Sequence, residues 1–203
     1  MEIAQALASS LGYSLELRRF PWKRVQVNLQ AGEIDMMILY FKTPERAKDV
    51  VYAEIPHIYE SSYLFVASNS NIQFDGNFAE VKSFKFGNVR GYSHGGIYDN
   101  AETLFKHAVN DEKSLIQILV NGRVDIAVGN KPTILLYAKE LGIEGQIKFL
   151  MPPIDIGPNY LAFSKTREDA HRLASLFSTE LKKFVKTSAY RGILDKYNFR
   201  IND

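Results

Sequence analysis

The stretch LQAGEIDMMI, residues 29–38, decides the fold. It is typical of the end of a helix, a glycine stop at Gly32 and a strand of buried apolar residues. The same pattern, Leu-x-x-Gly-x-(Ile/Val)-Asp-apolar, returns in LVNGRVDIAV, residues 119–128. Two helix–glycine–strand units predict two similar α/β lobes, and a cleft between two lobes is where we expect a ligand.

The amino-acid composition limits the classes of protein to which the chain can belong. The chain has 203 residues, 46% of them hydrophobic and 24% charged, with a net charge of +2 and no basic block. This is typical of a soluble globular protein and does not favour nucleic acid or an anionic membrane as a partner. Without cysteine, thiolate catalysis and zinc–thiolate sites are excluded, and the four histidines lack the spacing of helical metal ligands. We expect no cofactor, no metal site and no catalytic residue.

Helical and strand patterns alternate along the chain, as they do in α/β lobes. The patterns predict helices over residues 1–11, 21–31, 97–108, 112–121, 133–141 and 167–185, and a last helix capped by Ser188. They predict strands over residues 14–18, 34–41, 58–67, 83–89, 124–128, 147–150 and 160–163. The run 34–41 is nearly all apolar, which is typical of a parallel strand covered on both faces.

The chain should cross between the lobes twice. Turn residues follow the strand 58–67, and the strand 160–163 is placed to bring the chain back. We therefore expect lobe one to comprise residues 1–66 plus 164–203, and lobe two to comprise residues 67–163.

Several features in register resemble one family. They are Phe20-Pro21-Trp22, Leu29-x-x-Gly32-x-Ile34-Asp35, Thr43-Pro44-Glu45-Arg46, Gly91-x-Ser93, Leu119-x-x-Gly122-Arg123-Val124-Asp125 and Lys196-Tyr197. The chain resembles the amino-acid-binding branch of the type 2 periplasmic solute-binding proteins, the receptors of ABC importers. The resemblance spans essentially the whole chain. It implies two α/β lobes joined by a two-strand hinge that close on a small molecule, and no catalysis.

The resemblance also implies ligand-binding residues. Family members hold a ligand carboxylate with the arginine that corresponds to Arg46, because a planar guanidinium gives bidentate, charge-assisted bonds. The hydroxyl after the second-lobe glycine, here Ser93, usually helps. Tyr40, Phe41 and Tyr92 suggest an aromatic-lined cleft, although Phe41 fits simple strand core nearly as well.

Two positions depart from the amino-acid pattern. Phe41 stands where the family commonly has a small hydroxyl residue. Asn130 is the nearest candidate where the family offers an acid to the ligand ammonium, and an amide cannot supply that charge. A standard α-amino acid would need another acid, because an uncompensated buried ammonium is costly.

The start of the chain differs as well. Family members open with a signal peptide, a strand and an aromatic-bearing loop, whereas this chain begins inside the first helix. Either the start is an internal methionine or this is a true short form. A periplasmic location is expected from the resemblance, and an ABC importer is the expected partner.

Two other functions stay open. A few relatives of this fold are dehydratases of carboxylated rings, and His94 and Glu54 are the acid–base candidates for such chemistry. The same fold also serves as a sensory or effector module, whose partner would lie outside this chain.

Overall fold

The computed structural model describes residues 1–197 and 199. They divide into two compact units: unit 1 comprises Met1–Glu60 and the described residues from Pro158 onward, and unit 2 comprises Ser61–Gly157. Both boundaries fall inside strands, β3 (Ile58–Ala67) and β8 (Asp155–Ser164), so each of these strands belongs partly to each unit. The boundaries expected from the sequence lie further along the same two strands.

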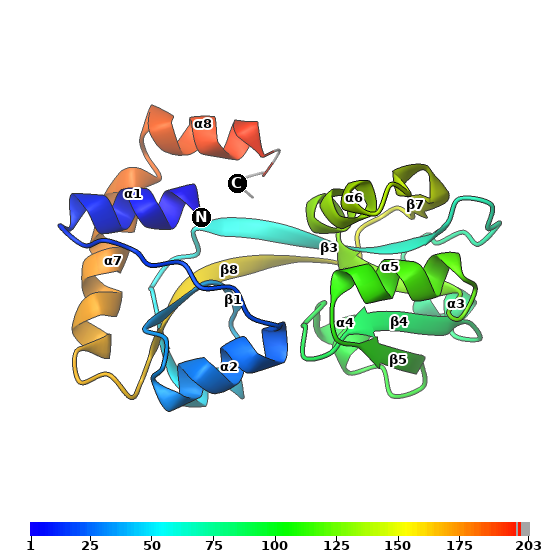
Figure 1. Cartoon of the computed structure of the whole chain (residues 1–203), viewed down its shortest axis with the longest axis horizontal. Coiled ribbons are helices and arrows are strands. Elements are labelled where there is room, and N and C mark those ends of the chain that lie inside the picture. The colour runs from blue at the N-terminus through cyan, green and yellow to red at the C-terminus, as the bar shows by residue number, and fades with distance from the viewer. Residues whose placement is uncertain (198, 200–203) are drawn as a thin grey trace. The chain divides into compact units, whose positions relative to one another are not determined.

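Unit 1 is a small sheet with helices on both faces (Figure 1). Besides parts of β3 and β8, it contains α1 (Glu2–Ser10), α2 (Trp22–Ala31), β1 (Met36–Phe41), the 3-10 helix η1 (Arg46–Lys48), β2 (Val50–Tyr52), α7 (Ala170–Phe184) and α8 (Ser188–Lys196). The apolar residues of α1, α7 and α8 form one core, which includes Leu7, Leu173 and Phe177. Leu29 of α2 belongs to a second core, with Met37 and Tyr40 of β1.

The prediction of a parallel strand over residues 34–41 is wrong. In the described part of the chain, β1 pairs only with β8 and is antiparallel to it, with Met36 opposite Phe163. β2 is also antiparallel to β8. An apolar run indicates that both faces of a strand are buried, and the two cores of unit 1 do bury both faces of β1. Such a run does not indicate the direction of the strand relative to its partner.

The glycine stop of the opening stretch is confirmed. Gly32 ends α2 in the left-handed conformation, with φ 76°. A Cβ atom at this position would lie 2.3 Å from Thr166 Oγ1. Both the backbone conformation and the neighbouring side chain therefore require glycine.

Unit 2 is a mixed sheet with helices on both faces (Figure 1). It contains the rest of β3 and β8, α3 (Phe78–Val81), β4 (Lys85–Val89), α4 (Gly96–Asp99), β5 (Phe105–Val109), α5 (Glu112–Val120), β6 (Ile126–Asn130), α6 (Lys131–Glu140), the 3-10 helix η2 (Glu144–Gln146) and β7 (Ile147–Phe149). β4 is parallel to β5 and β6, while β3 is antiparallel to β6 and β7. The second copy of the opening pattern forms α5 and β6.

Two predicted elements are absent. Residues 14–18 form no strand, because alternation alone cannot make a strand without a neighbour to hydrogen-bond. The helix predicted over residues 97–108 is replaced by the single turn of α4 and by β5, which pairs along its whole length with β4. In both cases the presence or absence of a partner strand elsewhere in the fold decides the structure, and the local sequence pattern does not indicate that partner.

Several element ends also differ from the prediction by a few residues. β8, for example, begins at Asp155 rather than residue 160. The segment after Thr43 forms the 3-10 turn η1, whose Arg46 backbone N–H donates to Thr43 Oγ1 at 3.2 Å. α8 is capped by Thr187 rather than Ser188, since Thr187 Oγ1 accepts from the Tyr190 N–H at 3.2 Å. None of the helices in the described part of the chain combines the length and apolarity that a bilayer crossing requires.

Candidate functional site

Arg46 is buried in unit 1, with 9% of its surface exposed. Its guanidinium carbon lies 4.6 Å from the centre of the Tyr40 ring and 5.5 Å from the Trp22 ring. Cation–π attraction favours this arrangement, and it strengthens where water is excluded. The structure therefore brings together Arg46, from the turn after β1, and aromatic side chains from β1 and the start of α2.

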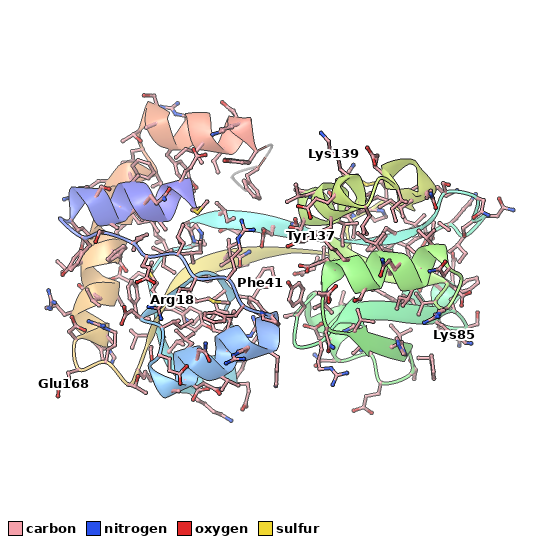
Figure 2. All side chains as sticks on the ribbon, in the orientation of Figure 1. Arg18, Phe41, Lys85, Tyr137, Lys139 and Glu168 are labelled. Carbon is pink, nitrogen blue, oxygen red and sulfur yellow. The ribbon has the colours of Figure 1, made fainter. Side chains whose placement is uncertain are left out.

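The carbonyl oxygen of Phe41 joins this cluster. It accepts from Arg46 Nη1 at 3.2 Å and from the Tyr52 hydroxyl at 3.1 Å. Burial raises the pKa of Tyr52, so its hydroxyl remains a donor under physiological conditions. Tyr52 in turn stacks on Tyr40, with ring centres 6.0 Å apart. Phe41, labelled in Figure 2, thus contributes its backbone, and its side chain is half-buried.

This arrangement fixes the orientation of the guanidinium. The Phe41 carbonyl oxygen anchors Nη1, and the aromatic rings beside the guanidinium favour its retained positive charge, which attracts an anion. Tyr40, Phe41 and Arg46, three predicted site residues, are therefore neighbours in unit 1, and the group suits recognition of an anion.

Ser93 lies in the loop after β4 in unit 2. Its hydroxyl donates to Asp99 Oδ2 at 2.6 Å, and the same carboxylate accepts the His94 backbone N–H at 3.0 Å. The loop is kept tight by Gly95, whose φ is 94°. A Cβ atom there would lie 2.4 Å from the carboxyl carbon of Asp155. The Ser93 hydroxyl is thus held by an acid of its own unit.

Tyr92 precedes Ser93 and also donates to an acid. Its hydroxyl lies 2.6 Å from Glu112 Oε1, at the first turn of α5. Tyr92 and Glu112 are both half-buried. Tyr92 and Ser93 are therefore two consecutive predicted site residues whose hydroxyl protons are both directed to carboxylates.

Asn130 has a structural role at the junction of β6 and α6. Its Oδ1 accepts from the backbone N–H of Thr133 at 3.2 Å and from the Thr133 hydroxyl at 3.0 Å. Its Nδ2 lies 3.5 Å from the carbonyl oxygen of Ser61. The side chain therefore caps α6.

A cluster of polar residues lies on and beside β3 and β8 within unit 1; His57 and Asn159 are buried and Glu60 is half-buried. Asn159 Nδ2 donates to Glu60 Oε2 at 2.6 Å, and Asn159 O accepts the His57 N–H at 3.0 Å. Burial raises the pKa of Glu60 from 4.5 to about 7, against the opposing effects of the Asn159 hydrogen bond and the Met1 amine. Burial lowers the pKa of His57 to about 4. Burial thus disfavours the charged form of both groups.

The two acid–base candidates are engaged elsewhere. His94 is 3% exposed, and its Nδ1 lies 3.3 Å from the hydroxyl of the buried Ser62. Glu54 forms an exposed ion pair with Lys182 on α7. Within the described residues, no group of three or more His, Asp or Glu side chains is placed to hold a metal ion.

The predicted site residues thus fall into two sets. Tyr40, Phe41 and Arg46 belong to unit 1, while Tyr92, Ser93 and Asn130 belong to unit 2. Sequence reasoning missed Tyr52, Asp99 and Glu112, and it assigned no role to Trp22. Trp22 could have been predicted from the sequence, because it lies in one of the motifs that carry the family resemblance. No sequence signal marked Tyr52, Asp99 or Glu112.

A comparison with protein families assigns the chain to one of them. Residues 1–200 match the family described as bacterial extracellular solute-binding proteins, family 3. Among curated proteins, none matches this chain.

Solved structures share the fold over nearly the whole chain. The substrate-binding protein of an amino acid ABC transporter is 24% identical, with 97% of this chain and 85% of that chain covered and a TM-score of 0.79. A histidine kinase sensor domain with similarity to periplasmic binding proteins is 18% identical over 97% and 83%, with a TM-score of 0.83. An ancestral amino acid-binding protein, a precursor of cyclohexadienyl dehydratase, is 22% identical over 97% and 83%, with a TM-score of 0.77.

Proposed function

Because this chain belongs to family 3 of the bacterial extracellular solute-binding proteins, we propose that it captures a small carboxylate-bearing solute, an amino acid or a related compound. The observation that carries the proposal is Arg46, which is buried and packed against the neighbouring rings of Trp22 and Tyr40. An arginine kept in a water-poor setting makes strong paired bonds to a carboxylate. The family is typically extracytoplasmic, and we propose a periplasmic location and delivery to an ABC importer.

We infer binding rather than turnover. Acid–base catalysis needs a side chain that can reach a substrate proton, and the two candidates are a buried His94 beside Ser62 and an ion-paired Glu54. The likeness to a dehydratase precursor and to a sensor domain concerns the fold. A prephenate-like acid incubated with the protein should therefore be recovered unchanged.

The role of Arg46 is tested by isothermal titration with a panel of L-amino acids and matched simple carboxylates. Arg46→Lys keeps a cation beside the rings but loses the bidentate fork, so affinity for every bound solute should fall by about tenfold or more. Arg46→Ala should abolish measurable binding.

Arg18→Lys is the matched control, since Arg18 (labelled in Figure 2) is exposed and pairs with Glu16 two residues away. It should bind as the unaltered protein does. A solute bound equally well by the Arg46→Ala variant would refute the role of Arg46.

A further inference from the structure

The carbonyl oxygen of Phe41 connects two side chains through one atom. It accepts from Arg46 Nη1 at 3.2 Å and from the Tyr52 hydroxyl at 3.1 Å. A backbone carbonyl has two lone pairs, so these two donors use its full capacity. Because Arg46 lies in η1 and Tyr52 ends β2, the two donors reach the oxygen from different elements of unit 1. A shift of this oxygen therefore disturbs both hydrogen bonds.

Tyr52 is held in place by β8 and by neighbouring rings. Its backbone lies opposite Ala162 of β8 in the antiparallel pair. Its ring stacks on Tyr40, with ring centres 6.0 Å apart, and contacts the Tyr160 ring edge-on at 5.7 Å. A tyrosine side chain has only two rotatable bonds to fix. The paired backbone and the packed ring therefore determine where the hydroxyl lies.

The Phe41 carbonyl, in contrast, lies at a weakly constrained part of β1. Phe41 is the last residue of this strand, and the register of β1 against β8 shifts between Met37 and Tyr40. Strand ends and irregular ladders open more readily than regular ladders do. The hydroxyl of Tyr52 thus restricts the peptide group to which Arg46 is bonded.

The hydrogen bond to Phe41 also controls how the guanidinium is turned. The rings of Tyr40 and Trp22, whose centres lie 4.6 Å and 5.5 Å from the guanidinium carbon, attract its charge as a whole. A hydrogen bond is directional, and its energy falls steeply when donor and acceptor are misaligned. The position of the Phe41 oxygen therefore affects the direction in which the N–H groups of Arg46 point.

We propose that Tyr52 is a positioning residue for Arg46, because its hydroxyl fixes the carbonyl oxygen against which the guanidinium is oriented. The inference rests on the proposed function and deepens it. It names a side chain that sets the affinity for a carboxylate by acting through Arg46. All the residues that carry it belong to unit 1.

A first test needs no solute and uses NMR of the full chain labelled with ¹⁵N-arginine. A guanidinium that turns freely gives one averaged signal for its two Nη atoms, whereas a restrained guanidinium gives two. Arg46 should give two signals in the unaltered protein, assigned by their absence from Arg46→Lys. In Tyr52→Phe, which keeps the ring and removes the hydroxyl, the two signals should broaden or merge.

A second test measures affinity by isothermal titration with L-arginine, L-glutamine and L-phenylalanine. Tyr52→Phe should weaken the binding of each bound amino acid by about three- to tenfold, as expected for the loss of one hydrogen bond. The same substitution in the Arg46→Lys background should change affinity by less than about twofold, because a lysine ammonium has no fork to orient. A merely structural role of Tyr52 would weaken binding equally in both backgrounds.

Tyr190→Phe is the matched control. Tyr190 is buried, and its hydroxyl also donates to a backbone carbonyl of unit 1, that of His57, at 2.8 Å. The variant therefore removes the same kind of hydrogen bond and leaves the Phe41 carbonyl untouched. The two Arg46 signals and the affinity should match those of the unaltered protein.

The two measurements decide separate claims. Two unchanged Nη signals in Tyr52→Phe would overturn the inference, whether or not any solute binds. An equal loss of affinity from Tyr52→Phe with and without Arg46→Lys, or an equal loss in Tyr190→Phe, would overturn it as well. If none of the three amino acids binds the unaltered protein, the proposed function fails, while the NMR comparison still decides whether Tyr52 orients Arg46.

Discussion

Glu60 makes the stability of unit 1 depend on pH. Its pKa in the folded chain is about 7, above the ordinary value of 4.5, so the folded state holds this proton more tightly than the unfolded state does. The stabilisation is complete below pH 4.5 and is lost as the pH rises through 7. Glu60→Gln keeps an acceptor for Asn159 and removes the partly buried charge. At pH 8 it should raise the free energy of unfolding by about 1–3 kcal/mol.

The measurement is urea unfolding of both proteins at pH 4.5 and pH 8, where the difference should appear only at the higher pH. Glu168→Gln serves as the control, because Glu168 is an exposed acid of the same unit (labelled in Figure 2). An equal gain for Glu60→Gln at both pH values would show that packing, and not ionisation, causes the effect.

The residues of the candidate site show how far sequence reasoning reaches. Arg46 was predicted as a site residue because Thr-Pro-Glu-Arg is a contiguous motif in register with the rest of the chain. The rings and the carbonyl oxygen that orient it come from α2, β1 and β2, and only the fold brings them together. Likewise, Ser93 was predicted from its position after Gly91, but its hydroxyl donates to Asp99, which no local pattern identifies.

At the scale of elements, Asn130 determines how α6 begins. Asn130→Ala removes the acceptor for the Thr133 N–H and should destabilise the protein by about 1 kcal/mol. Asn130→Asp keeps an acceptor and adds a negative charge at a helix N-terminus, so its stability should be close to that of the unaltered protein.

Thermal unfolding at pH 7 distinguishes the two variants. If Asn130→Asp proves as unstable as Asn130→Ala, the bond from Nδ2 to Ser61 O, and not the cap, is the more important contact.

Elements with local stop and start signals were predictable. α2 and α5 were predicted because each ends next to a glycine, Gly32 or Gly122, and because Asp111 caps α5. Strands were less predictable, because their partners are distant in sequence. The alternating segment 14–18 makes no strand, whereas residues 105–108, which were assigned to a helix, pair with β4.

At the scale of the whole molecule, the two-lobed α/β fold and the family were both predictable, since the duplicated pattern and the motifs span the chain. The two units nevertheless differ in the number of chain segments that form them. Unit 2 is continuous in sequence, whereas unit 1 is assembled from segments on either side of it. Folded unit 2 keeps its two ends together, because the Ile154 N–H donates to Ser62 O at 2.8 Å.

This connectivity predicts an asymmetric coupling of stability. If unit 2 unfolds, unit 1 must close a loop of about 100 residues, which costs on the order of 4–5 kcal/mol. Leu115→Ala, in the core of unit 2, should lower the stability of unit 2 by about 2–5 kcal/mol and reduce that of unit 1 with it.

Hydrogen exchange by mass spectrometry in increasing urea measures both units at once. Leu173→Ala, in the core of unit 1, is the reciprocal control: it should loosen α1 and α7 and leave the amides of β4 and β6 protected. Unit 1 amides that keep their normal midpoint in Leu115→Ala would contradict the coupling.

The pairing of β1 with β8 has a consequence during synthesis. The strand MMILYF leaves the ribosome early, but its partner residues 159–163 are made only after all of unit 2. At 5–20 residues per second, about 100 residues take roughly 5–20 s to translate. For that interval the nascent chain exposes an apolar strand without its partner, and a holdase that recognises extended apolar peptides would find a binding segment there.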